Sequence, residues 1–293
     1  MQGNTKTEKN ERVRKFNTKQ PNQRSKNMKV QIYLIILLTF INTFASEKTL
    51  DILIKTAMLN QDGVCVFVEC KNGSINSSDS SIDSIRFTPC STFKIWNTLI
   101  GFDCHIILSS DELFYKWDSI PRFLPSWNKD QTLKEAFQVS CVPGFQNLAR
   151  KIGIENMTKW IDTLNYGDKD ISSGIDDFWL PREGKKSIQI SPIEQAQLIR
   201  KLINGDLPFS VHSRNILKEI MLINKTSKGT LYGKTGSEAY INDNPKQNIG
   251  WFVGYVISNA KTHSFACLVK GESVSGKDSK KIIESILLES DLL

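Results

Sequence analysis

Histidine is scarce in this chain, and its cysteines lack the spacing of metal ligands. The 293 residues include three histidines and no His-Glu-x-x-His segment. None of the six cysteines belongs to a Cys-x-x-Cys pair. Zinc sites are commonly built from these motifs. The sequence therefore predicts no metal site.

The chain from Ser46 onward also lacks an excess of positive charge. The whole sequence carries a net charge of +7, but residues 1–27 hold eight lysines and arginines against two glutamates. Lys29 adds one more positive charge, so the remainder is close to neutral. A neutral body offers little to a phosphate backbone, and we expect no nucleic-acid partner. The composition, 40% hydrophobic and 24% charged, excludes a multi-span membrane protein, a collagen-like repeat and a disordered chain.

One apolar stretch lies near the N-terminus. Met28 and Lys29 precede the apolar run 30–44, and Thr43-Phe44-Ala45 places small residues before Ser46. This pattern predicts a signal peptide over 28–45, because a membrane span needs about 20 apolar residues. We expect residues 1–27 to be a non-native or disordered extension, and an exported mature chain over 46–293 with no stable membrane partner beyond export. An uncleaved signal anchor is the alternative.

Export would place the cysteines in an oxidising compartment, where disulfides form. The six are Cys65, Cys70, Cys90, Cys104, Cys141 and Cys267. The strand predicted over 63–71 would put Cys65 and Cys70 on opposite faces, about 16 Å apart. A disulfide needs Cα atoms within about 7 Å, so these two are not expected to pair. The other pairings stay open.

Periodicity predicts an α+β fold with an antiparallel sheet built from both ends of the mature chain. Strand-like runs cover 63–71, 229–234, 249–258 and 263–270, and helical spacing covers 131–137, 145–152, 156–164, 192–203 and 278–289. We expect a sheet part over 46–102 and 204–293 with flanking helices, and an inserted, mostly helical part over 103–203. A cleft between two such parts is a usual place for a small-molecule site.

Ser-x-x-Lys occurs three times, and one copy has a context suited to catalysis. Ser91 and Lys94 begin an apolar helix, whereas the copies at Ser126 and Ser258 lie in a predicted loop and turn. A helix N-terminus favours developing negative charge on Ser91. Lys94 lies one turn further on the same face, and apolar neighbours favour its neutral amine, which can activate the serine.

Two further motifs follow in order. Ser140-Cys141-Val142 ends a predicted helix, and Lys234-Thr235-Gly236 lies in a predicted strand. Together the three motifs form the constellation of penicilloyl serine transferases. In that constellation the second serine relays a proton, and the strand lysine and threonine hold an anionic substrate.

With these motifs and four more blocks, residues 46–293 resemble the class D β-lactamases (oxacillinases). The blocks that carry the resemblance are Ser91-Thr92-Phe93-Lys94 with 97–101, Ser140-Cys141-Val142-Pro143 with 146–153, Tyr166-Gly167-Asp168, Phe178-Trp179-Leu180, 190–195, Lys234-Thr235-Gly236 and 250–254. The resemblance implies a bacterial periplasmic or secreted hydrolase that opens β-lactam rings through an acyl-enzyme, as a monomer or homodimer.

The resemblance also assigns roles to residues. Ser91 would be the nucleophile, Ser140 would shuttle a proton, and Lys94 would carry a carbamate from CO2 as general base, held by Trp179. The carbamate needs no further cofactor, metal or organic. Backbone N–H groups of Ser91 and Ser237 would form the oxyanion hole. The residues expected to contact substrate are Val142, Leu180, Lys234, Thr235, Gly236, Ser237 and Lys280.

Three departures from the family pattern stand out. Asp168 replaces the usual asparagine, and Trp96 stands where proline is common. No arginine occurs over 275–281, so Lys280, or alternatively Lys277, would grip the substrate carboxylate. A lysine binds as a point charge without the bidentate fork of arginine, so we expect weaker substrate binding.

Two other functions use the same motifs. A β-lactam sensor domain and a penicillin-binding protein are both acylated without subsequent hydrolysis. Steady turnover would favour the lactamase, and burst acylation alone would favour either alternative. The preferred β-lactam subclass is not determined by the sequence, because loop lengths and cleft width decide it.

Overall fold

The computed structural model describes residues 50–182, 184–240, 247–259 and 261–293. The predicted signal peptide and the extension before it lie outside these residues. Among the residues described, no helix has the length and apolarity needed to cross a membrane.

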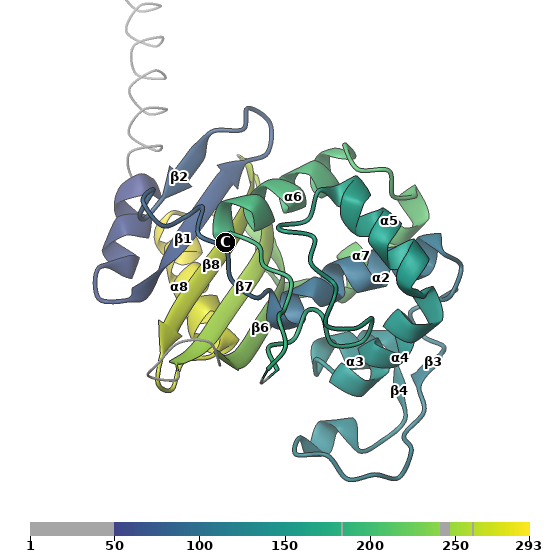
Figure 1. The fold of residues 1–293 in the computed structure, drawn as a ribbon. Helices are drawn as coiled ribbons and strands as arrows, with labels where there is room; N and C mark the ends of the chain where they lie inside the picture. Colours follow the sequence, from purple (N-terminus) through teal and green to yellow (C-terminus); the bar gives the residue numbers. More distant parts are fainter. Residues whose placement is uncertain (1–49, 183, 241–246, 260) are drawn as a thin grey trace, which may run out of the picture. The chain divides into compact units, whose positions relative to one another are not determined.

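A six-stranded antiparallel sheet forms the centre of the fold (Figure 1). Its order is β2 (Ile75–Ser77), β1 (Asp62–Glu69), β8 (Thr262–Gly271), β7 (Gln247–Ser258), β6 (Gly229–Tyr240) and β5 (Leu222–Lys225). β1 from the start of the described chain pairs with β8 from its end. The predicted α+β class, with a sheet assembled from both ends, is therefore confirmed.

The two faces of the sheet are covered by different helices. Helical residues 50–58 and α8 (Gly276–Glu289) form one core with Cys65 and Phe67 of β1. Val64, Val66 and Val68 of the same strand face the other, larger core. α6 (Pro192–Asn204) packs against β1 and β8 on that side. Because successive strand side chains alternate between faces, an uninterrupted apolar strand fills both cores.

The segment between β2 and β5 contains the remaining helices and a two-stranded ribbon. Most lie close to the predicted ranges, but α7 was not predicted, and Thr132 caps a helix expected to begin at Gln131. Its elements are η1 (Cys90–Phe93), α2 (Lys94–Asp103), β3 (Leu113–Tyr115), η2 (Pro125–Trp127), β4 (Gln131–Thr132), α3 (Leu133–Gln138), α4 (Val142–Ile152), α5 (Ile154–Leu164), α6 and α7 (Val211–Ile220).

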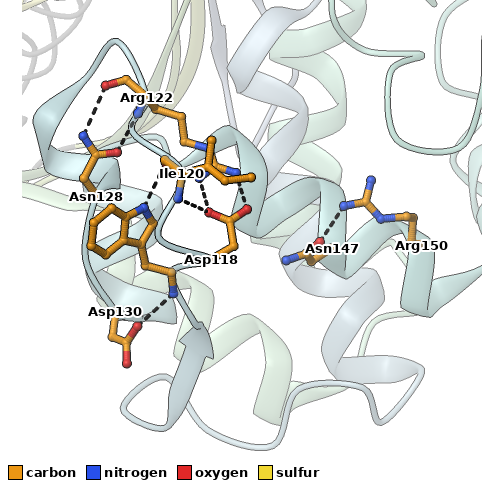
Figure 2. Close-up of polar contacts among 8 residues, drawn as sticks. Asp118, Ile120, Arg122, Asn128, Asp130, Asn147 and Arg150 are labelled. Carbon is orange, nitrogen blue, oxygen red and sulfur yellow. Dashed lines mark hydrogen bonds and ion pairs between the residues drawn. The ribbon is translucent and has the colours of Figure 1, made fainter.

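The loop between β3 and β4 is held by its own polar side chains (Figure 2). Arg122 forms an ion pair with Asp118, and its backbone N–H donates to Asn128 Oδ1 at 2.8 Å. The guanidinium lowers the pKa of Asp118 to about 2. The backbone N–H of Trp117 donates to the Asp130 carboxylate at 2.8 Å, which adds a further link within the loop. This loop contains Ser126, the first serine of the second Ser-x-x-Lys copy.

Candidate active site

A strained turn presents Ser91. Cys90 has φ 51°, in the left-handed region that residues with a side chain rarely adopt. Ser91 follows it in the 3₁₀ turn η1, and α2 begins at Lys94. The serine therefore lies in a turn that leads into the α-helix, slightly before the position expected for it. Strain of this kind persists only where the surrounding structure holds it, and it is common at active sites.

Lys94 is enclosed and lies against the Ser91 hydroxyl. Its side chain is fully buried, and Nζ lies 2.7 Å from Ser91 Oγ. The ring of Phe145 on α4 lies 5.4 Å from the same nitrogen. Burial lowers the pKa of Lys94 to about 7, against partial compensation by nearby Cys141 and Cys90. The amine therefore deprotonates near neutral pH and can act as a base.

A second lysine and serine face each other across the site. Ser140 also has positive φ, at 57°, in the turn between α3 and α4. Lys234 Nζ on β6 donates to Ser140 Oγ at 3.1 Å and to the Thr235 carbonyl at 2.8 Å. Burial lowers the pKa of Lys234, and the charge of Lys94 lowers it further. The two lysines are thus coupled, so a proton on one disfavours a proton on the other.

Gly236 lets β6 pass close to the turn that carries Ser91. A Cβ at this position would lie 3.0 Å from the Pro89 carbonyl oxygen and 3.2 Å from the Thr92 nitrogen. Backbone atoms at the start of η1 therefore occupy the space that a side chain at position 236 would need. On the other side, Ser237 Oγ accepts the backbone N–H of Gly276 at 2.8 Å, which ties the start of α8 to β6.

Trp179 packs against the turn that carries Ser91, and its indole nitrogen has no hydrogen-bond partner. Its ring stacks on Phe93 with centroids 5.9 Å apart, and its backbone carbonyl accepts from Thr88 Oγ1 at 3.4 Å. The side chain is fully buried, and Nε1 has no hydrogen-bond partner. An indole N–H can only donate, and a buried donor without an acceptor is costly. The environment suits an anion close to Nε1.

Charged residues tie the loop that carries Trp179 to its neighbours. Arg182 lies 3.7 Å from Glu238 on β6 and 3.8 Å from Asp177 within the loop. Gln146 of α4 donates to Asp177 at 3.2 Å. Leu180, between these contacts, is buried, and Val142 at the start of α4 is half-buried. The loop is thus anchored to both sides of the site.

Asp168 and Lys280 have local partners. The carboxylate of Asp168 accepts the backbone N–H of Gln189 at 2.9 Å and that of Asp170 at 3.2 Å. The side-chain oxygen of an asparagine could accept the same two hydrogen bonds, so an aspartate at this position holds the loop in the same way. Lys280 on α8 pairs with Glu284 at 3.5 Å and keeps a third of its side chain exposed.

The other two Ser-x-x-Lys copies have different surroundings. Ser126 lies in η2, and Lys129 pairs with Glu135 at 3.4 Å. Ser258 donates from Oγ to the backbone carbonyl of Lys261 at 2.7 Å, in the turn between β7 and β8. Both copies are therefore parts of loops, as expected.

Several supporting residues were not predicted from the sequence. The rings of Phe145 and Phe137 lie under Lys94 and Lys234, respectively. Trp251 Nε1 donates to the Thr88 carbonyl at 2.9 Å and so links β7 to the segment before η1. Of these residues, only Trp251 was indicated by the sequence, because it belongs to the block 250–254. In the part of the chain that the structure describes, no group of three or more His, Cys, Asp or Glu side chains could hold a metal ion.

Comparisons with known proteins agree with this geometry. The penicillin binding protein transpeptidase domain model matches residues 63–288. The chain is 38% identical over 208 residues to "Probable beta-lactamase YbxI" of Bacillus subtilis, covering 71% of this chain and 73% of the relative. The class D β-lactamase FUS-1 (OXA-85) of Fusobacterium nucleatum superposes with a TM-score of 0.73 at 36% identity, covering 80% and 94% of the two chains.

Other relatives have a different description. The chain is 34% identical over 208 residues to "Regulatory protein BlaR1" of Staphylococcus aureus. The match covers 71% of this chain and 34% of that protein. Sequence similarity to this chain therefore extends both to proteins described as lactamases and to proteins described as regulators.

Proposed function

The chain belongs to the class D β-lactamases, and from this membership we propose that Ser91 opens β-lactam rings with a carbamate on Lys94 as general base. The observation that carries the proposal is the 2.7 Å contact between Ser91 Oγ and a fully buried Lys94. A nucleophile beside a base of lowered pKa is the arrangement that serine acyl transfer requires.

Acylation follows from the positions of four side chains. Ser91 Oγ attacks the lactam carbonyl carbon and gives its proton towards the Lys94 side chain. Ser140, hydrogen-bonded to Lys234, relays a proton to the lactam nitrogen as the ring C–N bond breaks. Backbone N–H groups of Ser91 and Ser237 stabilise the oxyanion, where one lost donor costs roughly 3 kcal/mol of barrier.

The substrate carboxylate is held by Lys234 and Thr235, with Lys280 as a further cation. Gly236 keeps the strand close to η1, and Val142 and Leu180 form apolar walls. Lys280 forms an ion pair with Glu284, so its interaction with the substrate carboxylate should be weak. We expect moderate substrate affinity in consequence.

The carbamate fits the residues around Lys94. The group forms only from a neutral amine, and the lowered pKa of Lys94 provides one near pH 7. When present, it supplies an anionic oxygen as the base. Trp179 would hold it through the otherwise unpaired Nε1, in a pocket where an anion needs a donor.

Hydrolysis of a chromogenic cephalosporin by the purified protein tests the proposed function. Steady turnover is expected, and a stoichiometric burst without turnover would instead support a sensor like the regulator relative or a penicillin-binding protein. Ser91→Ala should abolish both turnover and labelling by a fluorescent penicillin. Ser126→Ala and Ser258→Ala are the matched controls and should label normally.

We also propose export to the periplasm or medium, starting at Met28 and with cleavage near Ser46. The charged and apolar pattern over 28–45 supports this. N-terminal sequencing of exported protein should begin at or near Ser46. Retention of residues 1–27 would contradict it.

A further inference from the structure

Two cysteines lie directly opposite each other on neighbouring strands, away from the catalytic groups. Cys65 of β1 and Cys267 of β8 are register partners. Both are fully buried in the core between the sheet and α8. Lys234 lies on a different strand, and Tyr232, two residues earlier on the same strand face, belongs to the opposite core. The proposed hydrolysis uses neither cysteine.

Backbone hydrogen bonds show which kind of antiparallel pair these cysteines form. The N–H of Cys70 donates to the Thr262 carbonyl at 2.8 Å, so hydrogen-bonded pairs between these strands recur at every second residue from Cys70. Cys65 is out of phase with that series. Its carbonyl accepts instead from the N–H of Ser78 at 2.9 Å, on the side away from β8. Cys65 and Cys267 are therefore a non-hydrogen-bonded pair.

Pairs of this kind have the spacing that a disulfide needs. Their Cα atoms lie about 4.5 Å apart and their side chains leave the sheet on the same side. A disulfide accommodates Cα separations from about 4.4 to 6.8 Å. The two side chains are close in the structure, since hydrogen bonding to Cys267 contributes to the raised pKa of Cys65. No other two of the six cysteines, all of which are described, are register partners.

We propose that Cys65 and Cys267 are oxidised to a disulfide that links β1 to β8 when the chain folds in the presence of a disulfide oxidant. One cysteine thiolate attacks oxidised glutathione and releases one glutathione thiolate. The second cysteine then attacks the mixed disulfide and releases another. Two electrons pass from the cysteines to glutathione, and the two thiol protons go to the glutathione thiolates.

Burial of both cysteines determines the stage of folding at which this bond can form. Both side chains are fully buried in the folded protein, and an oxidant cannot reach a thiol that has no exposed surface. Burial also raises the pKa of the Cys65 thiol, which depletes the reactive thiolate. Oxidation therefore precedes closure of the core by α8.

The linkage would join two strands near opposite ends of the described chain. A disulfide stabilises mainly by restricting the unfolded chain, and the effect grows with the length of chain between the cysteines. Here that segment contains the whole helical region and most of the sheet. We expect the linked protein to melt about 10 °C above the reduced protein. Turnover should be unchanged, because the bond lies on the other face of the sheet.

Refolding followed by peptide mapping tests the proposal. The full chain is reduced, unfolded in urea and refolded with a mixture of oxidised and reduced glutathione, and its free thiols are then alkylated under denaturing conditions. Digestion without reduction should release a peptide that joins Cys65 to Cys267. Refolded, active protein in which both cysteines are alkylated, or in which Cys267 is joined elsewhere, would overturn the proposal.

Two controls separate the bond from other effects of oxidation. Folded, reduced protein exposed to the same mixture should not form the link within hours, and rapid linkage there would contradict formation before core closure. The difference in Tm between oxidised and reduced forms should vanish in Cys267→Ala. It should persist in Cys104→Ala, which removes a partly exposed thiol. Persistence of the difference in Cys267→Ala would show that another bond causes it.

Discussion

The environment of Lys94 is unlike that of a solvent-exposed lysine. It is fully buried, it lies over an aromatic ring, and its amine is hydrogen-bonded to the Ser91 hydroxyl. Lys234 is also buried, but its ammonium donates to Ser140 and to a backbone carbonyl. Hydrogen bonds from the charged form favour that form. Burial and the charge of Lys94 nevertheless lower the pKa of Lys234. Loss of the Lys94 proton removes this repulsion, so Lys94 can be the base while Lys234 keeps its proton as a cation for the substrate.

The lowered pKa of Lys94 predicts an acid limb in turnover. Below about pH 7 the amine is protonated and cannot bind CO2, so kcat should fall as the pH drops through this value. Added bicarbonate should restore part of the lost turnover, most strongly near pH 6. Steady-state rates with and without bicarbonate measure the effect. Indifference to bicarbonate at every pH would exclude a carbamate base.

Trp179→Phe removes one hydrogen-bond donor and keeps the stack on Phe93. Acylation should survive, while deacylation should slow by about 100-fold, because release of the product also needs the base. Pre-steady-state traces would then show a burst followed by slow turnover. Trp160→Phe is the control, since that ring stacks on Phe209 with centroids 4.6 Å apart. Normal deacylation in Trp179→Phe would leave the indole with a packing role only.

The contact between β6 and η1 sets the position of Ser91. Gly236→Ala would press a methyl group against the backbone at Pro89 and Thr92, which cannot move without moving Ser91. We expect kcat/KM to fall by at least about ten-fold, since small displacements of reacting groups are costly.

Gly271→Ala provides the matched control for this contact. The nearest atom to its added Cβ is a side-chain methyl of Val274 at 3.1 Å, which can shift. This variant should retain nearly full activity in the same assay. Equal losses in both variants would mean that Gly236→Ala acts through general destabilisation.

Sequence periodicity predicted most of the sheet because β1, β7 and β8 contain long apolar runs. The edge strand β5 was not predicted, since a short, exposed strand carries little periodic signal. The motif serines and lysines were found from local spacing. The rings under the lysines and the pairing of Cys65 with Cys267 were not, because both depend on contacts between distant segments. The strand predicted over 63–71 ends earlier, at Glu69, and Cys70 lies in the turn that follows it.

The buried lysine also affects the stability of the whole molecule. Its pKa is about 7 in the folded chain and 10.5 when unperturbed, so between these values the unfolded chain binds a proton that the folded chain does not. The free energy of unfolding therefore rises with pH across this window. Below pH 7 the burial of Lys94 lowers the free energy of unfolding by its full amount, on the order of 5 kcal/mol.

Lys94→Met should remove this cost together with the activity. The variant should melt at a higher temperature than the wild type near pH 7, without added bicarbonate. Its advantage should shrink steadily as the pH rises towards 10. Thermal unfolding of both proteins across this range isolates the effect, because other titrating groups are common to both. A Tm difference that is independent of pH would contradict the lowered pKa.

In the proposed reaction of the whole molecule, Ser91 forms an acyl-enzyme that is then hydrolysed. Time-resolved mass spectrometry of the intact protein mixed with a penicillin measures both steps. We expect an adduct of the full penicillin mass that maps to the peptide containing Ser91 and disappears as the substrate is consumed. An adduct that persists after the free penicillin is gone, or one attached to another residue, would contradict the proposed reaction.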